Sequence, residues 1–388
     1  MNHWSFRTVR ARAVRVLNSR TLISRALISP VFILSVLTLA VLQGCGPAGG
    51  DEYYSVNDFS GVKKIDVHAH QLTTRTGFVD QAVKDNFVLL SLNTEVPDYP
   101  PVDSQQYYIL QLRHRYPKEI YCIVTFETAT MDQPGWADRQ LAYLKKAFDS
   151  GAVGVKVWKN IGMSLKDKNG RFIMIDDPVF DPIFDYLEKN DIPVIGHIGE
   201  PKNCWLPLDS MTTRNDSSYF AAHPQYHMYL HPEDPSYDAI IRSRDHLLEK
   251  HPNLRFTGAH LGSLEWDVDE IAKRFERFPH MCVDPAERLG QLQYQSIQNW
   301  QKVHDFFIKY QDRIMYGTDL EDNASEAPDY IVKHAHELWT RDWRYFTSED
   351  SLESPFVRQK FKALHLPKSV IDKIYYKNAE RWYLEKKN

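Results

Sequence analysis

The feature that most constrains the fold is a repeated pattern after residue 60, in which short apolar runs alternate with longer amphipathic stretches. A short β-branched apolar run predicts a buried strand, and an amphipathic stretch predicts a surface helix. The predicted strands are 63–69, 87–92, 119–125, 152–158, 192–197, 254–259, 281–284 and 313–318. The predicted helices include 137–149, 181–189, 237–250 and 266–277.

Alternation of strands and helices predicts an α/β chain with a parallel sheet. From His70, after the first strand, to Asp319, after the eighth, the seven steps average about 36 residues, close to a βαβ unit with its loops. Eight such strands favour a closed (β/α)8 TIM barrel. A doubly wound open sheet is the alternative, but no Gly-x-Gly-x-x-Gly motif follows the first strand.

Two of the predicted connections are long. Residues 201–236 follow the fifth strand and are rich in Pro, His, Tyr and Trp, and residues 320–358 follow the eighth strand. Both leave from carboxyl ends of strands, where barrel enzymes build their sites. Long connections in a compact domain are uncommon and are usually functional. We therefore expect lid insertions after strands 5 and 8.

The first fifty residues differ from the rest of the chain. They contain six Arg and no acidic residue, followed by an apolar run over 26–42 and the sequence Leu42-Gln43-Gly44-Cys45. A basic segment, an apolar run and small residues before the cut are typical of a secretory signal. Cysteine at the first mature position resembles a bacterial lipobox, which implies lipidation of Cys45 and an exported, membrane-anchored lipoprotein in the periplasm or at the cell surface. A single N-terminal transmembrane helix is the alternative.

These features divide the chain into a signal peptide over 1–44, a lipidated Cys45 with a linker over 45–60, and a barrel domain over 61–388. The residues after the first fifty carry a formal net charge of −10, because the six Arg of that segment are part of the chain's 47 basic residues against 51 acidic ones. An acidic body argues against a nucleic-acid partner. The three other cysteines have no zinc-type spacing and are predicted to be buried thiols, with one disulfide through Cys204 left open: Cys122, Cys204 and Cys282.

The strongest chemical signal is the sequence Asp66-Val67-His68-Ala69-His70 in the first strand. Side chains alternate along a strand, so Asp66, His68 and His70 are predicted to share one face. The apolar residues of the other face would point to the helices: Ile65, Val67 and Ala69. Two neutral imidazoles pointing into the barrel mouth can bind one metal ion.

Later strands end in the same kind of residue. His197 ends the fifth strand, His260 follows the sixth, and Asp319 follows the eighth. The carboxyl ends of barrel strands meet at one face, so these side chains are predicted to lie near those of the first strand. Imidazoles and one carboxylate suit Zn²⁺, with Mn²⁺ or Fe²⁺ less favoured.

This pattern of residues resembles the amidohydrolase superfamily, in the branch called amidohydrolase-related or amidohydrolase 2, which includes decarboxylases of the aminocarboxymuconate-semialdehyde type and lactone hydrolases. The resemblance runs from about residue 63 to the C-terminus, where 374–381 looks like the family's terminal helix. It implies one divalent metal, usually zinc, with no second metal expected. The implied ligands are His68, His70, His197 and Asp319.

In the same resemblance, His260 is the catalytic acid/base or the substrate-polarising residue. A bound ion lowers the pKa of a water molecule towards ~7, and a base within hydrogen-bond reach then takes the proton. Asp319 and His260 are the two candidates for that base. A hydrolase would direct the hydroxide at a carbonyl, whereas the branch's decarboxylases add it to a carbon–carbon double bond.

Lys156 and Trp158 are predicted to point into the barrel, because valines alternate with them in 152–158. Lys156 could contact a substrate carboxylate, form a structural ion pair, or be the carbamylated lysine that bridges two metals in other members of the superfamily. Lys159 has the opposite parity and is expected to be peripheral. Arg288, four residues after Asp284, is a candidate carboxylate clamp.

The sequence therefore predicts a metal-dependent hydrolase that acts on a small carboxylate, lactone, ester or amide through a metal-activated water. A metal-dependent non-oxidative decarboxylase is one alternative, and a catalytically silent ligand-binding lipoprotein is another. The expected partners are a small-molecule substrate and the membrane that holds the N-terminal lipid anchor. Homo-oligomerisation is compatible with the sequence.

Overall fold

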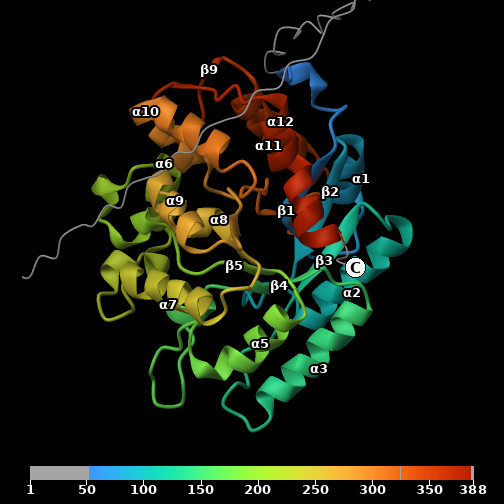
Figure 1. Ribbon diagram of the computed structural model, residues 1–388, viewed down its shortest axis with the longest axis vertical. Helices are drawn as coiled ribbons and strands as arrows, with labels where there is room; N and C mark the ends of the chain where they lie inside the picture. Colours follow the sequence, from blue (N-terminus) through green and yellow to red (C-terminus); the bar gives the residue numbers. More distant parts are fainter. Residues whose placement is uncertain (1–51, 324, 386–388) are drawn as a thin grey trace, which may run out of the picture. The chain divides into compact units, whose positions relative to one another are not determined.

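The computed structural model describes residues 52–323 and 325–385, and the predicted signal peptide and Cys45 lie outside this part of the chain (Figure 1). A parallel sheet has the strand order β7-β6-β5-β4-β3-β2-β1-β8. Its strands are β1 (Lys64–Gln71), β2 (Phe87–Leu92), β3 (Ile120–Thr125), β4 (Gly154–Val157), β5 (Val194–Gly196), β6 (Phe256–Gly258), β7 (Met281–Val283) and β8 (Leu320–Asp322).

Helices follow the strands and surround them in Figure 1. The main helices are α1 (Gly77–Lys84), α2 (Val102–Arg115), α3 (Trp136–Asp149), α5 (Asp181–Lys189), α7 (Tyr237–Lys250), α9 (Val268–Arg277), α10 (Leu289–Lys309) and α11 (Pro328–Thr347). The shorter elements are α4 (Asn160–Met163), α6 (Arg214–Ala222), α8 (Ala259–Gly262), α12 (Lys368–Asp372), and the hairpin strands β9 (Ser351–Leu352) and β10 (Phe361–Lys362). The fold is the predicted (β/α)8 barrel.

Two short segments together take the place of the eighth strand of the barrel. Ile314 pairs in parallel with Val283 of β7, and the amide of Val67 donates to the carbonyl of Tyr316 over 3.0 Å. Strand β8 then pairs with the end of β1. The chain therefore closes the barrel between β7 and β1, at the segment predicted as the eighth strand (313–318).

The barrel interior is apolar beneath the site. Side chains from β1, β2, β3, β5 and β7, together with Ala259 and Met315, form one buried cluster with the C-terminal segment, which reaches it through Ala379 and Tyr383. The hydroxyl of Tyr383 lies 2.8 Å from that of Thr257 in β6. A second and larger cluster lies between the strands and the outer helices. The C-terminal segment therefore closes the end of the barrel opposite the polar residues at the strand ends.

Strand β1 contains a β-bulge that changes which side chains face the interior. Asp66 lies opposite Leu89 of β2, but Ala69 lies opposite Ser91, so β1 advances three residues while β2 advances two. A bulge re-aims the side chains that follow it, and bulges are frequent beside active sites.

Because of the bulge, the predicted division of β1 into two faces is correct for its two histidines and wrong for Asp66. Asp66 lies on the outer side, where its carboxylate accepts a hydrogen bond from Trp339 of α11 over 3.2 Å. Ile65 and Val67, which we expected to face the helices, belong to the interior cluster. The alternation rule assumes a regular strand, and the extra residue breaks it.

The two long insertions have different structures. Residues 201–236 form α6 and several short 3₁₀ helices, held by a small apolar cluster of Cys204, Met211, Phe220 and Met228. Residues 320–358 instead form β8, α11 and β9, and Trp339 and Trp343 of α11 are buried in the main core. The second segment is therefore part of the barrel wall and not a lid, because its helix carries an apolar face that packs on α1 and β2.

The remaining predictions on the body concern thiols and membrane spans. Cys122, Cys204 and Cys282 are buried and free, as predicted, and the open disulfide through Cys204 does not form. Within residues 52–323 and 325–385, no helix has the length and apolar character that crossing a bilayer requires.

Candidate metal centre

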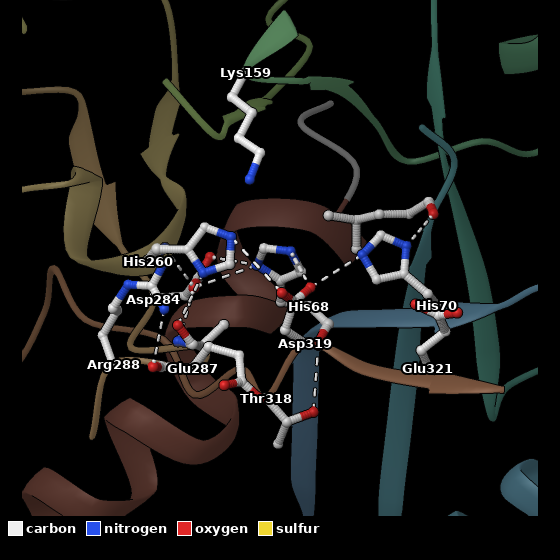
Figure 2. Close-up of polar contacts among 12 residues, drawn as sticks. His68, His70, Lys159, His260, Asp284, Glu287, Arg288, Thr318, Asp319 and Glu321 are labelled. Atoms are coloured by element: carbon white, nitrogen blue, oxygen red, sulfur yellow. Dashed lines mark hydrogen bonds and ion pairs between the residues drawn. The ribbon is translucent and has the colours of Figure 1, made fainter. Parts of the chain in front are cut away.

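Three histidines converge on one carboxylate at the carboxyl end of the barrel (Figure 2). Oδ1 of Asp319 lies 3.0 Å from Nε2 of His68 and 3.1 Å from Nε2 of His70. Oδ2 of Asp319 lies 3.9 Å from Nε2 of His260. Within the described part of the chain, His68, His260 and Asp319 are the group whose ligand atoms all lie within 4.8 Å of one another, close enough to hold a metal ion.

The other ring nitrogen of each histidine faces an oxygen that can only accept a hydrogen bond. Nδ1 of His68 lies 3.3 Å from Asp284, Nδ1 of His70 lies 2.8 Å from the Leu92 carbonyl, and Nδ1 of His260 lies 2.9 Å from the Ala286 carbonyl. Each Nδ1 therefore carries the proton, and in a neutral ring each Nε2 presents a lone pair. Contacts of this kind orient the histidine ligands of metal sites.

The Nε2 atoms of His68 and His70 both face the carboxylate of Asp319. Burial would lower the pKa of His68, but Asp319 and Asp284 raise it overall, so this group of residues favours a positive charge among them. Nε2 of His260 and Nε2 of His197 are buried and have no hydrogen-bond partner in the described residues. Buried polar atoms are rarely left unpaired in native proteins. The residues therefore fit a divalent metal ion.

His197, predicted as a ligand, lies next to this group. The ring centroids of His197 and His260 are 4.1 Å apart. Burial, followed by nearby positive groups, holds the pKa of both histidines well below the usual range. Both rings are therefore neutral at physiological pH, which is the protonation state that metal binding requires.

Asp319 is kept ionised by its neighbours. Burial on its own would raise the pKa of this carboxyl group, but the charge of His68 and hydrogen bonds from His68 and His70 outweigh burial and hold the pKa well below its usual range. The residue has a positive φ of 69°, which is uncommon outside glycine. This backbone turn directs the carboxylate back toward the histidines.

The chain leading to Asp319 passes very close to the first strand. A Cβ atom at Gly317 would lie 2.9 Å from Cβ of His68 and 3.3 Å from Cβ of Asp284. Only glycine allows this approach, which brings the segment before Asp319 into contact with His68 and with Asp284, the residue that orients the His68 ring.

A cavity of about 860 Å³ opens above the candidate ligands. Lys156 and Trp158 line it, as predicted from the valine alternation in β4. Nζ of Lys156 lies 3.1 Å from Nε2 of His68 and is almost fully buried. Burial lowers the pKa of Lys156 to about 8. No carboxylate of the described residues pairs with its ammonium group, so the structural ion pair considered for it does not form.

Lys159 and Arg288 are placed differently from what we expected. Lys159 lines the cavity and pairs with Glu200, so it is not peripheral; β4 ends at Val157, and strand parity does not apply beyond that point. Figure 2 shows Lys159 pointing toward the histidines. Arg288 is not among the residues that line this cavity, and its nearest carboxylate is Glu200, at 3.8 Å.

Sequence reasoning gave no role to two residues that the structure brings to the site. Asp284 accepts from Nδ1 of His68 and from the amide of His260. Its position at a strand end was a usable signal, but its partners depend on the fold. Tyr99 lines the cavity, lies edge-on to His70 and donates a hydrogen bond to Glu321, and its loop carries no sequence signal for this placement.

Fold and site together define a TIM-barrel protein with a histidine- and aspartate-rich metal centre. The family model described as Amidohydrolase matches residues 125–384. The chain therefore belongs to the amidohydrolase family, a family of metal-dependent enzymes. None of the curated proteins matches this sequence.

Solved structures with similar folds include enzymes of several kinds. The 2,6-dihydroxybenzoate decarboxylase from Rhizobium is 16% identical, with a TM-score of 0.46 over 82% of this chain and 98% of that chain. The 5-carboxyvanillate decarboxylase from Novosphingobium aromaticivorans, a complex with manganese, is 16% identical, with a TM-score of 0.42 over 78% of each chain. The 4-oxalomesaconate hydratase from Rhodopseudomonas palustris is 11% identical, with a TM-score of 0.44 over 82% of this chain and 95% of that chain.

Proposed function

We propose that this protein is a metal-dependent decarboxylase of a small carboxylic acid. The observation that carries the proposal is the position of Lys156, whose Nζ lies 3.1 Å from Nε2 of the candidate ligand His68. Among the residues that the structure describes, Lys159 is the only other lysine that lines the cavity, and it already pairs with Glu200. The ammonium group without a carboxylate partner thus lies at the metal centre, so a carboxylate bound to it is the reacting group.

The residues proposed to hold the metal are His68, His70, His260 and Asp319, with His197 beside them. A divalent ion held there would act as a Lewis acid on a carboxylate or carbonyl oxygen. When the ion occupies Nε2 of His68, the Lys156 ammonium is free to bind the substrate carboxylate. With its pKa near 8, Lys156 is mostly protonated at neutral pH and can donate a proton from Nζ to the carbon that loses CO2.

Hydrolysis is the second candidate function, and the ionised state of Asp319 favours it. Its carboxylate lies beside the histidine ring nitrogens, 3.0 Å from Nε2 of His68, where it could accept a proton from an attacking water. Lys156 would then stabilise the negative charge that develops on the attacked carbonyl oxygen. The two functions use the same residues and differ in the bond that breaks.

The test begins with metal analysis of the purified protein and of its Asp319→Asn variant. We expect about one equivalent of zinc or manganese, lost in the variant. The metal-loaded protein is then incubated with carboxyl-¹³C aromatic and unsaturated acids, and with lactones and esters. Release of ¹³CO2 supports the decarboxylase, whereas acid and alcohol products without CO2 establish hydrolysis. Wild-type protein that binds no metal after reconstitution would overturn both.

We further propose that the protein is an exported lipoprotein anchored through Cys45. The support is the basic and apolar N-terminal sequence that ends in Gly44-Cys45. Cys45→Ala should remove labelling by radioactive palmitate and should move the protein out of the membrane fraction. Unchanged labelling in the variant would contradict the anchor, and unchanged membrane association without labelling would favour the transmembrane alternative.

A further inference from the structure

The residues that carry His260 form a left-handed turn. His260, Leu261, Gly262 and Ser263 have φ angles of 57°, 58°, 65° and 54°. For residues with a Cβ atom this conformation is unfavourable, and it normally occurs as single residues and not as a run. Three of the four residues have a Cβ atom, so contacts with the surrounding structure must hold the turn.

The turn determines where the His260 imidazole lies. The amide of His260 donates to Oδ1 of Asp284 over 3.1 Å, and the amide of Leu261 donates to the Asp284 carbonyl over 2.6 Å. These bonds fix the start of the turn against β7. The His260 ring then faces Asp319 and lies against the His197 ring, tilted relative to it. A right-handed backbone at this point would direct the imidazole elsewhere.

Two side chains of α7 bind the carbonyl groups at the end of the turn. Arg244, which is fully buried, donates from Nη1 to the carbonyl of Gly262. Tyr237 donates from its hydroxyl to the carbonyl of Ser263. The Ser263 hydroxyl in turn donates to the Gly199 carbonyl over 2.7 Å, next to the loop that follows β5.

The Arg244 guanidinium is itself held rigidly. Its Nε and Nη2 donate to Oδ1 of Asp245 over 3.1 and 2.7 Å. The second oxygen of Asp245 accepts from Nε of Arg274 over 3.2 Å. Arg244 and Arg274 thus share one carboxylate, but only Arg244 reaches the turn. A buried charge in this position is costly unless it is hydrogen-bonded, and the Arg244 guanidinium makes one of its hydrogen bonds to the turn, at the Gly262 carbonyl.

We propose that Arg244 is a positioning residue, whose buried guanidinium holds the left-handed turn over 260–263 and thereby fixes His260 at the metal centre. The inference rests on the proposed function, because His260 belongs to the group that could hold the metal. Arg244 touches neither the cavity nor a candidate ligand. It acts through the backbone carbonyl of Gly262.

The test uses Co²⁺ as the probe on the full-length protein. Arg244→Met is compared with Arg274→Met, because both lose a bond to Asp245 and only the first loses the bond to Gly262. We expect Arg244→Met to weaken Co²⁺ binding by roughly tenfold or more and to change the visible absorption of the bound ion, as expected for loss of an outer contact in a metal site. Arg274→Met should stay within about twofold of wild type, and Arg244→Lys should recover part of the loss.

A second readout does not depend on the metal. The ¹³Cε1 resonance of His260, assigned with His260→Gln, should shift in Arg244→Met and not in Arg274→Met. If Arg244→Met does not fold, Tyr237→Phe removes the neighbouring bond to the turn and should shift the same resonance. Wild-type Co²⁺ affinity, spectrum and His260 resonance in folded Arg244→Met would overturn the proposal, as would equal effects in both arginine variants. A wild-type protein that binds no Co²⁺ would overturn the proposed function, while the resonance would still test Arg244.

Discussion

The carboxylate of Asp66 binds Thr318 twice, through the backbone amide at 3.1 Å and through the hydroxyl group at 2.6 Å. The same carboxylate accepts from the amide of His68 and from the indole of Trp339. Asp66 therefore joins the strand that carries His68 to the segment that carries Asp319. The bulge in β1 makes this possible, because it turns Asp66 outward while the histidines stay in the cavity.

Replacing Asp66 by Ala should destabilise the protein and loosen the metal centre together. Four donors lose one buried acceptor, which predicts a decrease of roughly 3 kcal/mol in the free energy of unfolding. Urea denaturation followed by circular dichroism measures this change, and metal content measures the effect on the centre. The exposed Asp209 provides the control, and Asp209→Ala should change stability by less than about 0.5 kcal/mol. Equal stability of the two variants would show that the hydrogen bonds of Asp66 do not hold β1 to the segment that carries Asp319.

Gly317→Ala should disturb the same region through steric contact alone. The added Cβ would lie 2.9 Å from Cβ of His68, closer than two carbon atoms can approach without movement. We expect a loss of roughly 1–3 kcal/mol in stability, as for other overpacked sites, and weaker metal binding. Gly61→Ala is the matched control, because a Cβ there would meet nothing closer than 3.6 Å. Wild-type metal affinity in Gly317→Ala would mean that His68 can shift without cost to the site.

The sequence predicted the barrel well because its strands are short, apolar and bounded by polar residues. The segment 87–92 was predicted to the residue as β2, and the eighth wall was placed at 313–318, where the chain closes the barrel. The chain's membership of the amidohydrolase family was likewise visible in the histidine and aspartate residues at the strand ends.

Local backbone irregularities were not visible in the sequence. The bulge after Asp66 depends on pairing with β2, and the left-handed turn over 260–263 depends on contacts from α7. Residues such as Leu261 and Ser263 are common in ordinary helices and loops, so nothing in their identity indicates a positive φ. Tertiary contacts decide these conformations, and they are the features that orient the site.

The change in stability between pH 4.5 and about 7 should report on Glu265. Burial raises the pKa of Glu265 to about 7, from an ordinary value of 4.5. Below pH 4.5 both folded and unfolded chains hold the proton. Between pH 4.5 and about 7 the unfolded chain releases it while the folded chain does not, so this residue lowers stability as pH rises, by up to about 3 kcal/mol.

Glu265→Gln removes this titration and keeps an oxygen that can accept the hydrogen bond from the amide of Lys202. Urea denaturation at pH 5 and at pH 8 measures the free energy of unfolding at each pH. From pH 5 to pH 8 this free energy should therefore fall less in Glu265→Gln than in wild type. The exposed Glu337 serves as the control, and Glu337→Gln should leave the pH dependence of wild type unchanged. A variant that follows the wild-type pH curve would show that Glu265 ionises normally in the folded protein.

Lys156 should separate metal binding from carboxylate binding. In Lys156→Met the histidines and Asp319 are intact, so the protein should keep about one equivalent of zinc. The loss of a buried charged hydrogen bond, worth about 1.5–3 kcal/mol, should weaken benzoate binding by tenfold or more. Quenching of the fluorescence of Trp158, which lines the same cavity, measures that affinity.

The exposed Lys166 is the matched control, because it lies over the ring of Phe172 and away from the cavity lining. Lys166→Met should bind both zinc and benzoate as wild type does. Benzoate affinity unchanged in Lys156→Met would remove the observation on which the decarboxylase proposal depends. Two equivalents of zinc in wild type and fewer in Lys156→Met would instead indicate a carbamylated Lys156 that bridges two ions, and intact mass analysis would show the added carbamate.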